Sequence, residues 1–310
     1  MRRGNDGKPD VGRARFRWSV RLNGEDMPVM TFNFNRGDTV LTLKFDLDES
    51  KSNEKTILNF LQGGKFYEPD VSHILLKVLG DGDVVFDIGA NVGFFTLLAA
   101  TLVGPAGHVV AFEPDAANLV RLRANCTLND LRNVTVIEKA VTSQEGQVRF
   151  FINSDDSGGN ALWDPGQFPG NQKSLANPVS LAVVATTLDS ECARLKLGTP
   201  KLIKIDTEGA DQGVLEGARD LLSRRTTPFV VCELHEFGLA KMGCSQQSLR
   251  SLMEGFGYST FGISYNGALP KLIPPATIIK SRLFINLLFS TPKRVGEYWP
   301  TTFIDPRDPR

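Results

Sequence analysis

The chain has 310 residues, which is enough to bury a full hydrophobic core, and one α/β domain with additions is the natural expectation. Its hydrophobic content of 41% and its charged content of 23% are ordinary for a soluble globular protein. Lysine plus arginine and aspartate plus glutamate number 35 each, so no overall basic field favours a nucleic-acid-binding protein.

The cysteines and the apolar segments indicate the compartment. The cysteines form no C-x-x-C pair, which is typical of reduced thiols in a cytoplasmic protein. The N-terminal arginines are not followed by the apolar segment of a signal peptide. The late apolar run over 283–289 is too short to span a bilayer. We therefore expect a cytoplasmic protein without a membrane span.

The first part of the chain predicts an extension in front of the main domain. Residues 1–15 are polar and rich in glycine and arginine, and we expect them to be disordered. Residues 29–34 and 40–47 alternate between apolar and polar around a glycine-containing loop, which predicts a β-hairpin. A helix is expected over 52–61. Together these elements form an N-terminal extension over 1–65 that could cover the cofactor end of a sheet.

A strand, a glycine turn and a helix then follow one another at 84–98. The apolar run at 84–88 predicts a strand that is buried on both faces. Gly89 and Gly93 let the backbone turn tightly and approach a ligand closely. Apolar residues at helical spacing come next, so the backbone N–H groups of a helix start point into the turn. This order predicts a nucleotide-type pocket at the first strand of an α/β sheet.

The residues of this turn bear on which nucleotide binds there. A dinucleotide site has a G-x-G-x-x-G turn, whereas here Gly89 and Gly93 are separated by three residues that include Asn91. Asp87 precedes the glycines, and its carboxylate would repel a pyrophosphate. The same charge would favour the ammonium and sulfonium groups of S-adenosylmethionine. The pattern therefore favours S-adenosylmethionine over a nicotinamide dinucleotide.

The next strands supply further residues for this pocket. An apolar strand over 108–112 ends at Glu113, about twenty residues beyond the glycine turn. An acid at that position can accept hydrogen bonds from both ribose hydroxyls of a nucleoside. A helix over 116–128 and a strand over 134–137 follow, and we expect Ala140 to lie at the adenine edge.

A long polar segment separates the two halves of the predicted sheet. Strands are expected over 147–152 and 183–188, followed by a helix over 189–195. The segment 153–177 between these strands is rich in Gly, Pro, Asp and Asn, and loops of this length are often functional. We interpret it as an acceptor-binding segment, and a merely mobile insertion is the alternative.

Acidic side chains follow a second apolar strand. The strand over 201–205 ends at Asp206, and Glu208 comes two residues later. A further strand at 229–234 brings Glu233 and His235 to the same edge. Ligands bind at the carboxyl ends of the strands in an open parallel sheet. These side chains are therefore the candidates for the acceptor end of the pocket.

The last elements complete the predicted sheet. A helix is expected over 248–256, and strands over 258–264 and 282–289 are expected to form a closing antiparallel pair. The remainder, 291–310, is rich in proline and arginine and is expected to be a C-terminal surface tail.

The combination of motifs resembles one known family. The stretches F-D-I-G-A-N-V-G at 86–93, F-E-P at 112–114, T-T-L-D at 186–189 and I-K-I-D-T-E-G-A-D at 203–211 are similar to those of FkbM-family methyltransferases, which have the class I methyltransferase fold. The resemblance covers roughly 66–290, including Tyr67-Glu68-Pro69. The family usually has Glu where this chain has Asp211.

The resemblance carries several implications. It implies a Rossmann-like, seven-stranded, mostly parallel sheet with helices on both faces in a methyltransferase domain over 66–290. It implies an S-adenosylmethionine-dependent O-methyltransferase that acts on a hydroxyl of a sugar in a glycan or of a natural product. It adds Glu68 and Pro114, from the matching motifs, to the donor-binding residues. The predicted donor-binding residues are therefore Glu68, Asp87, Gly89, Asn91, Gly93, Glu113, Pro114 and Ala140.

The catalytic assignment leaves alternatives. A hydroxyl becomes a good nucleophile when a base takes its proton. His235 is the first candidate for that base because histidine titrates near neutral pH, and Asp206 is its rival. Asp206 with Glu208 could instead hold a divalent cation, although we do not expect a metal. The other hypotheses are a nicotinamide-dependent dehydrogenase and a non-catalytic module that binds S-adenosylmethionine. The acceptor and the oligomeric state do not follow from the sequence.

Overall fold

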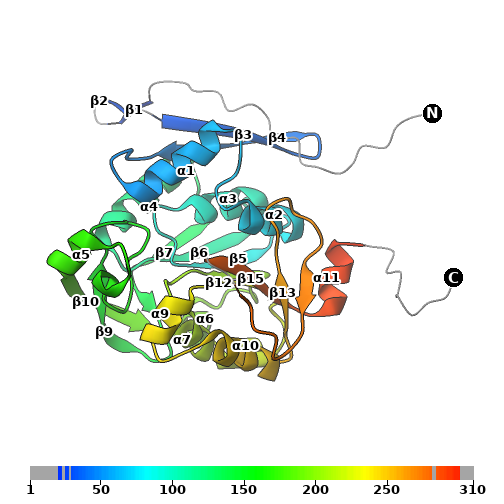
Figure 1. The fold of residues 1–310 in the computed structure, drawn as a ribbon. Helices are drawn as coiled ribbons and strands as arrows, with labels where there is room; N and C mark the ends of the chain where they lie inside the picture. Colours follow the sequence, from blue (N-terminus) through cyan, green and yellow to red (C-terminus); the bar gives the residue numbers. More distant parts are fainter. Residues whose placement is uncertain (1–19, 23–24, 28, 281–283, 301–310) are drawn as a thin grey trace.

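The computed structural model describes residues 20–22, 25–27, 29–280 and 284–300 (Figure 1). The expected disordered segment 1–15 and the last part of the expected tail, 301–310, lie outside the described residues. Two short strands at the start, β1 (Val20–Leu22) and β2 (Glu25–Met27), pair antiparallel.

A large mixed sheet lies at the centre of the molecule. In spatial order its strands are β14 (Lys271–Ile273), β13 (Ser259–Gly262), β15 (Ile285–Ser290), β12 (Phe229–Leu234), β11 (Leu202–Ile205), β5 (Val84–Ile88), β6 (His108–Phe112) and β7 (Val134–Ile137). The five strands from β12 to β7 are parallel, and β15 runs antiparallel to both β12 and β13. The predicted mostly parallel, Rossmann-like sheet is confirmed. The short β14 adds an eighth strand that we did not predict.

Helices cover both faces of this sheet, because its parallel strands are apolar on both sides. Side chains alternate along β5, so Val85 packs in the first core and Phe86 in the second. The first face carries α2 (Pro69–Val78), α3 (Phe94–Val103), α4 (Ala116–Leu128) and α11 (Pro292–Tyr298). The second carries α6 (Leu188–Leu195), α7 (Asp211–Glu216), α8 (Arg219–Ser223) and α10 (Gln246–Gly255).

The N-terminal extension contains the predicted hairpin and helix. Strands β3 (Val29–Arg36) and β4 (Thr39–Asp46) pair antiparallel, and α1 (Ser52–Gln62) follows them. The side-chain oxygens of Asn125 on α4 and of Asn129 directly after it accept hydrogen bonds of 2.8 Å each from the backbone N–H groups of β4. The hairpin therefore lies over the helices of the first face and not over the ligand end of the sheet, as Figure 1 shows at the top of the molecule. Among the described elements of the extension, only α1 contributes residues to that end.

A small second sheet lies beside the central one. Its strands are β8 (Ala140–Val141), β10 (Val179–Thr186) and β9 (Gly146–Ile152), in this order. The long segment between β9 and β10 contains a short 3-10 helix, Pro165–Gln167, and α5 (Gln172–Ala176). Strand β10 begins four residues earlier than predicted, so the loop is shorter than expected.

The C-terminal part differs from the expected surface tail. Residues 292–298 form α11, in which Val295 is buried, and Trp299 directly after the helix is buried too. Both side chains join the core of the first face because their apolar surface is removed from water there. Within the described part of the chain, none of the helices combines the length and hydropathy that a membrane span needs.

Candidate functional site

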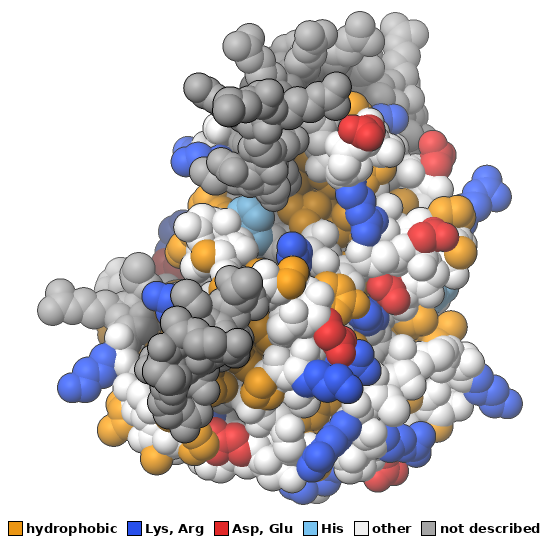
Figure 2. Space-filling view, turned by 90° about the vertical axis from the view of Figure 1, so that its right-hand side faces the viewer, with side chains coloured by type: hydrophobic (Ala, Val, Ile, Leu, Met, Phe, Trp, Pro, Cys, Tyr) orange, Lys and Arg blue, Asp and Glu red, His pale blue; other side chains and the backbone are white. Residues whose placement is uncertain are grey.

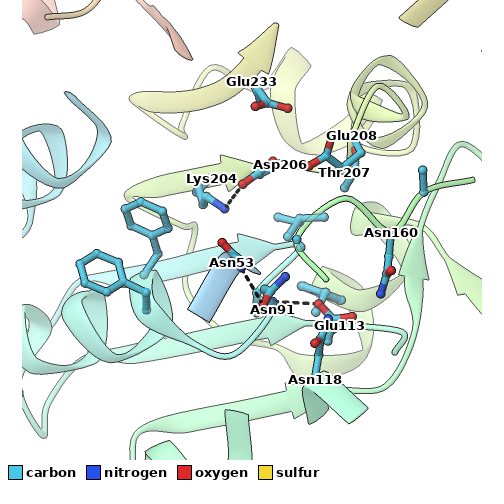
Figure 3. Close-up of a pocket in the computed structure, with 18 of the residues that line it drawn as sticks. Asn53, Asn91, Glu113, Asn118, Asn160, Lys204, Asp206, Thr207, Glu208 and Glu233 are labelled. Carbon is cyan, nitrogen blue, oxygen red and sulfur yellow. Dashed lines mark hydrogen bonds and ion pairs between the residues drawn. The ribbon is translucent and has the colours of Figure 1, made fainter. Parts of the chain in front are cut away.

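A cavity of about 330 Å³ lies at the carboxyl ends of β5, β6, β11 and β12. Two groups of polar side chains line it (Figure 3). Asn91, Glu113 and Asn118 lie at one end, and Asp206, Glu208 and Glu233 lie at the other. The structure therefore brings together the glycine turn and the acidic strand ends that the sequence predicted separately.

The turn after β5 brings the backbone close to the cavity. Gly89 has φ +78°, and a Cβ atom there would lie 1.9 Å from the carbonyl oxygen of Asp206. Only glycine fits such a close approach. Asn91 is also left-handed, with φ 51°, and lines the cavity. Gly93, the residue before α3, does not line it. A Cβ at Gly93 would lie 2.6 Å from the side chain of Leu122, so this glycine serves helix packing.

Glu113 follows β6 and faces the cavity, as predicted. Its side chain is 4% exposed, and its two oxygens accept hydrogen bonds from the backbone N–H groups of Asn91 and Asp115 at 2.8 Å each. Burial raises the pKa of Glu113 to about 7, although these two bonds oppose the rise. A carboxylate has about four lone-pair positions, so it can still accept bonds from a ligand's hydroxyl groups.

Asp87 does not line the cavity, in contrast to the expected direct contact with the ligand. It lies on the strand face that points toward α3, where its Oδ2 accepts a hydrogen bond of 2.6 Å from Thr96. Its Oδ1 lies 3.9 Å from the Nζ of Lys204. Burial raises the pKa of Asp87, and Lys204 partly offsets that effect. Asp87 therefore faces Lys204 and does not contact the cavity, so the predicted direct role of Asp87 in donor binding needs this correction.

The remaining predicted donor-binding residues, Glu68, Pro114 and Ala140, all line the cavity. Pro114 and Ala140 lie at the Glu113 side, after β6 and in β8. Glu68 precedes α2 in a left-handed conformation, with φ 39°. Burial, followed by the charge of Asp206, raises the pKa of Glu68 to about 7.

The opposite end of the cavity is strongly acidic. Asp206 bonds the Nζ of Lys204 through its Oδ2 at 2.9 Å (Figure 3). Burial first, and then the charge of Asp206, raises the pKa of Glu208 well above its ordinary value. Burial and the charge of Glu208 do the same to the pKa of Glu233. Burial alone would lower the pKa of Lys204, but Asp206 and Asp87 outweigh this and raise it. One ammonium group therefore faces several carboxylates.

His235 lies beside this acidic end but does not line the cavity. It is 2% exposed, and its Nδ1 lies 3.7 Å from the Oε2 of Glu208. Its ring packs among the aromatic rings of Trp163, Phe168 and Phe284. Burial lowers the pKa of His235, so the imidazole is neutral near pH 7. It can reach a ligand only through Glu208, which weakens its case as the direct base.

The segment after β9 closes one side of the cavity. Residues 156, 158 and 160–162 line it. Asp156 accepts a hydrogen bond of 2.8 Å from Ser52 of α1, and the indole N–H of Trp163 donates to the carbonyl oxygen of Glu208 at 2.6 Å. The segment is therefore connected to both the N-terminal extension and the acidic loop.

Several cavity residues were not predicted. Among them are Asn53 on α1, Asn118, Asn160 and Lys204. A lysine inside an otherwise apolar strand is a signal that could have identified Lys204, because a buried charge needs a partner. The other three carry no such signal in the sequence.

The face toward the viewer in Figure 2, on the side of α11 and β13 in Figure 1, carries interspersed basic and acidic side chains. No broad basic patch is visible among the described residues of this face.

Comparison with protein families gives one match. Residues 87–260 match the family model described as the methyltransferase FkbM domain. The matched region runs from β5 to β13 and includes most of the cavity.

Three curated relatives are all named as methyltransferases. The hexuronic acid methyltransferase AglP of Haloferax volcanii is 27% identical over 169 residues, which cover 54% of this chain and 62% of AglP. The 2-O-methyltransferase NoeI of Sinorhizobium fredii is 26% identical over 55% of this chain and 70% of NoeI. The 31-O-demethyl-FK506 methyltransferase FkbM of Streptomyces tacrolimicus is 29% identical over 51% of this chain and 67% of that protein. The chain thus covers less than two thirds of AglP.

Solved structures were compared as well. A methyltransferase FkbM from Methylobacillus flagellatus is 17% identical, with a TM-score of 0.40, over 76% of this chain and 53% of that chain.

Proposed function

Because the chain belongs to the FkbM methyltransferase family, we propose that it transfers a methyl group from S-adenosylmethionine to a hydroxyl group of a sugar-containing acceptor. The observation that carries the proposal is the position of Glu113, buried at the carboxyl end of β6 and facing a cavity whose other end is acidic. The family match speaks against the dehydrogenase hypothesis.

The donor's nucleoside fits the Glu113 end of the cavity. The ribose hydroxyls would donate to Glu113, whose two backbone bonds hold it in place. The adenine would lie against the apolar wall formed by Ala140, Phe150 and Leu162. Asn118 and Asn160 in the same wall offer amide groups to the adenine edge. Of the predicted donor-binding residues, this arrangement gives Glu113 and Ala140 direct contacts with the nucleoside.

The acidic end suits the positive end of the donor. S-adenosylmethionine carries an ammonium and a sulfonium group, and both are attracted by nearby carboxylates. Glu68 and Asp206 line this part of the cavity, and Lys204 hydrogen-bonds the Oδ2 of Asp206 and not its Oδ1. Glu68 and Asp206, and not Asp87, therefore supply the negative charge that attracts the donor.

Asp206 is the base that we assign to the reaction. It lines the cavity, whereas His235 does not, and its Oδ1 is not engaged by Lys204. Oδ1 takes the proton of the acceptor hydroxyl while the oxygen attacks the methyl carbon. The C–S bond breaks, its electron pair stays on sulfur, and S-adenosylhomocysteine is released. Holding the reacting atoms in line supplies much of the rate.

A sugar acceptor is supported by the rim of the cavity. Tyr265 and Phe284 line it with side chains that are 68% and 51% exposed. Exposed aromatic faces beside hydrogen-bonding groups such as Asn286 suit a ligand with apolar C–H faces and hydroxyl edges. The names of the relatives, which include a hexuronic acid and a 2-O-methyl product, support the same class.

Isothermal titration with S-adenosylmethionine is the first test. We expect binding to the wild type, binding weakened about tenfold to hundredfold by Glu113→Gln, and unchanged binding for Glu138→Gln. Glu138 is a matched control because its side chain is 60% exposed and it does not line the cavity. Absence of binding to the folded wild type, or binding of NAD in its place, would contradict the proposal.

Methyl transfer to sugars is the second test. With labelled donor and glycan fractions as acceptors, Asp206→Asn should lower kcat by about 10²-fold or more, whereas donor binding should be weakened but not lost. Donor binding without transfer to any glycan or natural product would instead indicate the non-catalytic module.

A further inference from the structure

We propose that Glu208, Glu233 and His235 bind one divalent transition-metal ion at the acidic end of the cavity. Each residue offers one ligand atom, and these atoms lie within 4.8 Å of one another. Ligand atoms about 2.1 Å from a common ion are at most about 4.2 Å apart, so small side-chain movements close the site. The sequence favoured Asp206 with Glu208 if any metal bound, and it favoured no metal overall.

The burial of His235 and its lack of hydrogen bonds within the described residues give the strongest support for a metal ion. His235 is only 2% exposed, and neither ring nitrogen has a hydrogen-bond partner among the described residues. An imidazole buried without partners costs free energy. Nδ1 lies 3.7 Å from the Oε2 of Glu208, so one nitrogen is directed at the carboxylate cluster. A metal ion at that point would use the lone pair of that nitrogen.

The carboxylates point to a cation independently of the histidine. The Oε2 of Glu233 is buried and also has no hydrogen-bond partner among the described residues. Glu208 and Glu233 lie together at the ends of neighbouring strands, away from Glu113 (Figure 3). Lys204, whose side chain lines the same cavity, bonds Asp206 at 2.9 Å. A divalent ion would neutralise the two glutamates that Lys204 does not bond.

The surrounding backbone holds the three ligands in place. His235 and Glu233 are separated by one residue at the end of β12, so a single strand end positions both. Glu208 is held from the other side, because Trp163 donates to its carbonyl oxygen at 2.6 Å. Gly209 packs so tightly on Gly238 that a Cβ would lie 2.3 Å from the Gly238 carbonyl carbon. The loop and the strand end are therefore fixed relative to each other.

The ligand set selects the kind of metal. One imidazole nitrogen with two carboxylate oxygens suits Mn²⁺, Fe²⁺ or Zn²⁺ better than Mg²⁺ or Ca²⁺, which prefer oxygen ligands alone. An ion here would act as a Lewis acid on the acceptor hydroxyl, and Asp206 would remain free as the base. That role rests on the proposed function, whereas metal binding itself does not.

Equilibrium binding of Mn²⁺ tests the site without any activity measurement. The protein is freed of metal with a chelator and titrated with Mn²⁺ while the free ion is followed by electron paramagnetic resonance. We expect one ion per chain for the wild type. His235→Asn and Glu233→Gln should each weaken binding at least tenfold, because the loss of a ligand exceeds the effect of an outer-shell change.

Two variants serve as controls. His108→Asn removes a histidine at the start of β6, whose ring bonds Thr135 on the neighbouring β7. Glu138→Gln removes an exposed carboxylate. Both should bind Mn²⁺ as the wild type does. Circular dichroism and urea unfolding establish that each variant is folded.

The outcomes separate the two proposals. A folded wild type that binds S-adenosylmethionine but neither Mn²⁺ nor Zn²⁺ overturns the metal site. Mn²⁺ binding that neither His235→Asn nor Glu233→Gln weakens overturns it as well. Metal binding that depends on both residues supports the site, even if S-adenosylmethionine does not bind and the proposed function fails.

Discussion

The buried carboxylate of Glu113 makes the stability of the protein depend on pH in a calculable way. In the folded chain, burial raises the pKa of Glu113 from 4.5 to about 7. The folded state therefore holds the proton more tightly than the unfolded state does. The stabilisation is fully present below pH 4.5 and is lost as the pH rises through about 7.

The size of the effect follows from the two pKa values. A rise in pKa from 4.5 to about 7 corresponds to about 3 kcal/mol of unfolding free energy, and about 2.5 kcal/mol of it is lost between pH 5 and pH 8. This is a large fraction of the stability of a typical domain.

Urea unfolding of the wild type and Glu113→Gln at pH 5 and pH 8 measures this effect. The variant lacks the titrating group but also loses a hydrogen bond, because its amide cannot accept from both backbone N–H groups. That loss is the same at both pH values. We therefore expect the variant to gain about 2 to 3 kcal/mol relative to the wild type between pH 5 and pH 8.

Glu138→Gln is the control, and its curve should follow the wild type because the side chain of Glu138 is 60% exposed. If Glu113→Gln and the wild type changed in parallel from pH 5 to pH 8, the reasoning about the buried carboxylate would be refuted. At pH 8, added S-adenosylmethionine should stabilise the wild type more than the variant.

Three further variants test the ion pairs of Lys204, the glycine turn and the packing of the hairpin. Lys204→Met leaves Asp87 and Asp206 without their counter-charge and should lower the unfolding free energy by about 3 kcal/mol in urea, whereas an unchanged midpoint would show that the ion pairs contribute little. Gly89→Ala places a methyl group 1.9 Å from the carbonyl oxygen of Asp206, so we expect S-adenosylmethionine binding to be lost in a calorimetric titration. Wild-type affinity of this variant would contradict the close approach of Gly89 to Asp206. Phe45→Ala empties a fully buried position of the hairpin and should cost about 3 to 5 kcal/mol with little change in donor affinity, and a loss below about 1 kcal/mol would mean that the hairpin is not firmly packed.

Most of the fold was predictable because its signals are local. The apolar run at 84–88, the glycine turn and the helical spacing after it depend only on neighbouring residues, and β5 and α3 form there. The final antiparallel pairing of β13 with β15 was also predicted and is confirmed. Strand β14, in contrast, has only three residues and no clear alternation, so nothing in the sequence marked it.

The site was predictable where backbone geometry alone determines position. Gly89, Asn91 and Glu113 follow strands directly, and carboxyl ends of parallel strands meet at one edge. Asp87 lies inside a strand, where the side chain points to one face or the other. When a strand is buried on both faces, the sequence does not reveal to which face a given side chain points. The contact of Asp87 with Lys204 could therefore not be foreseen.

Other site features depend on distant contacts. Asn53 reaches the cavity because α1 packs beside the glycine turn, where its Nδ2 donates to Asn91 at 3.2 Å. His235 is withdrawn from the cavity because aromatic rings from separate segments surround it. Neither arrangement has a signature in a single sequence, since each is set by tertiary packing.

The place of β15 in the sheet has a consequence for how the chain folds during synthesis. Residues 285–290 lie between β12 and β13, so each of those strands lacks one of its two neighbours until this late segment has left the ribosome. Until then the growing chain presents two unpaired strand edges, which are sites of aggregation. A nascent chain stalled before residue 285 should therefore need chaperones, although its whole donor-binding turn has already been made.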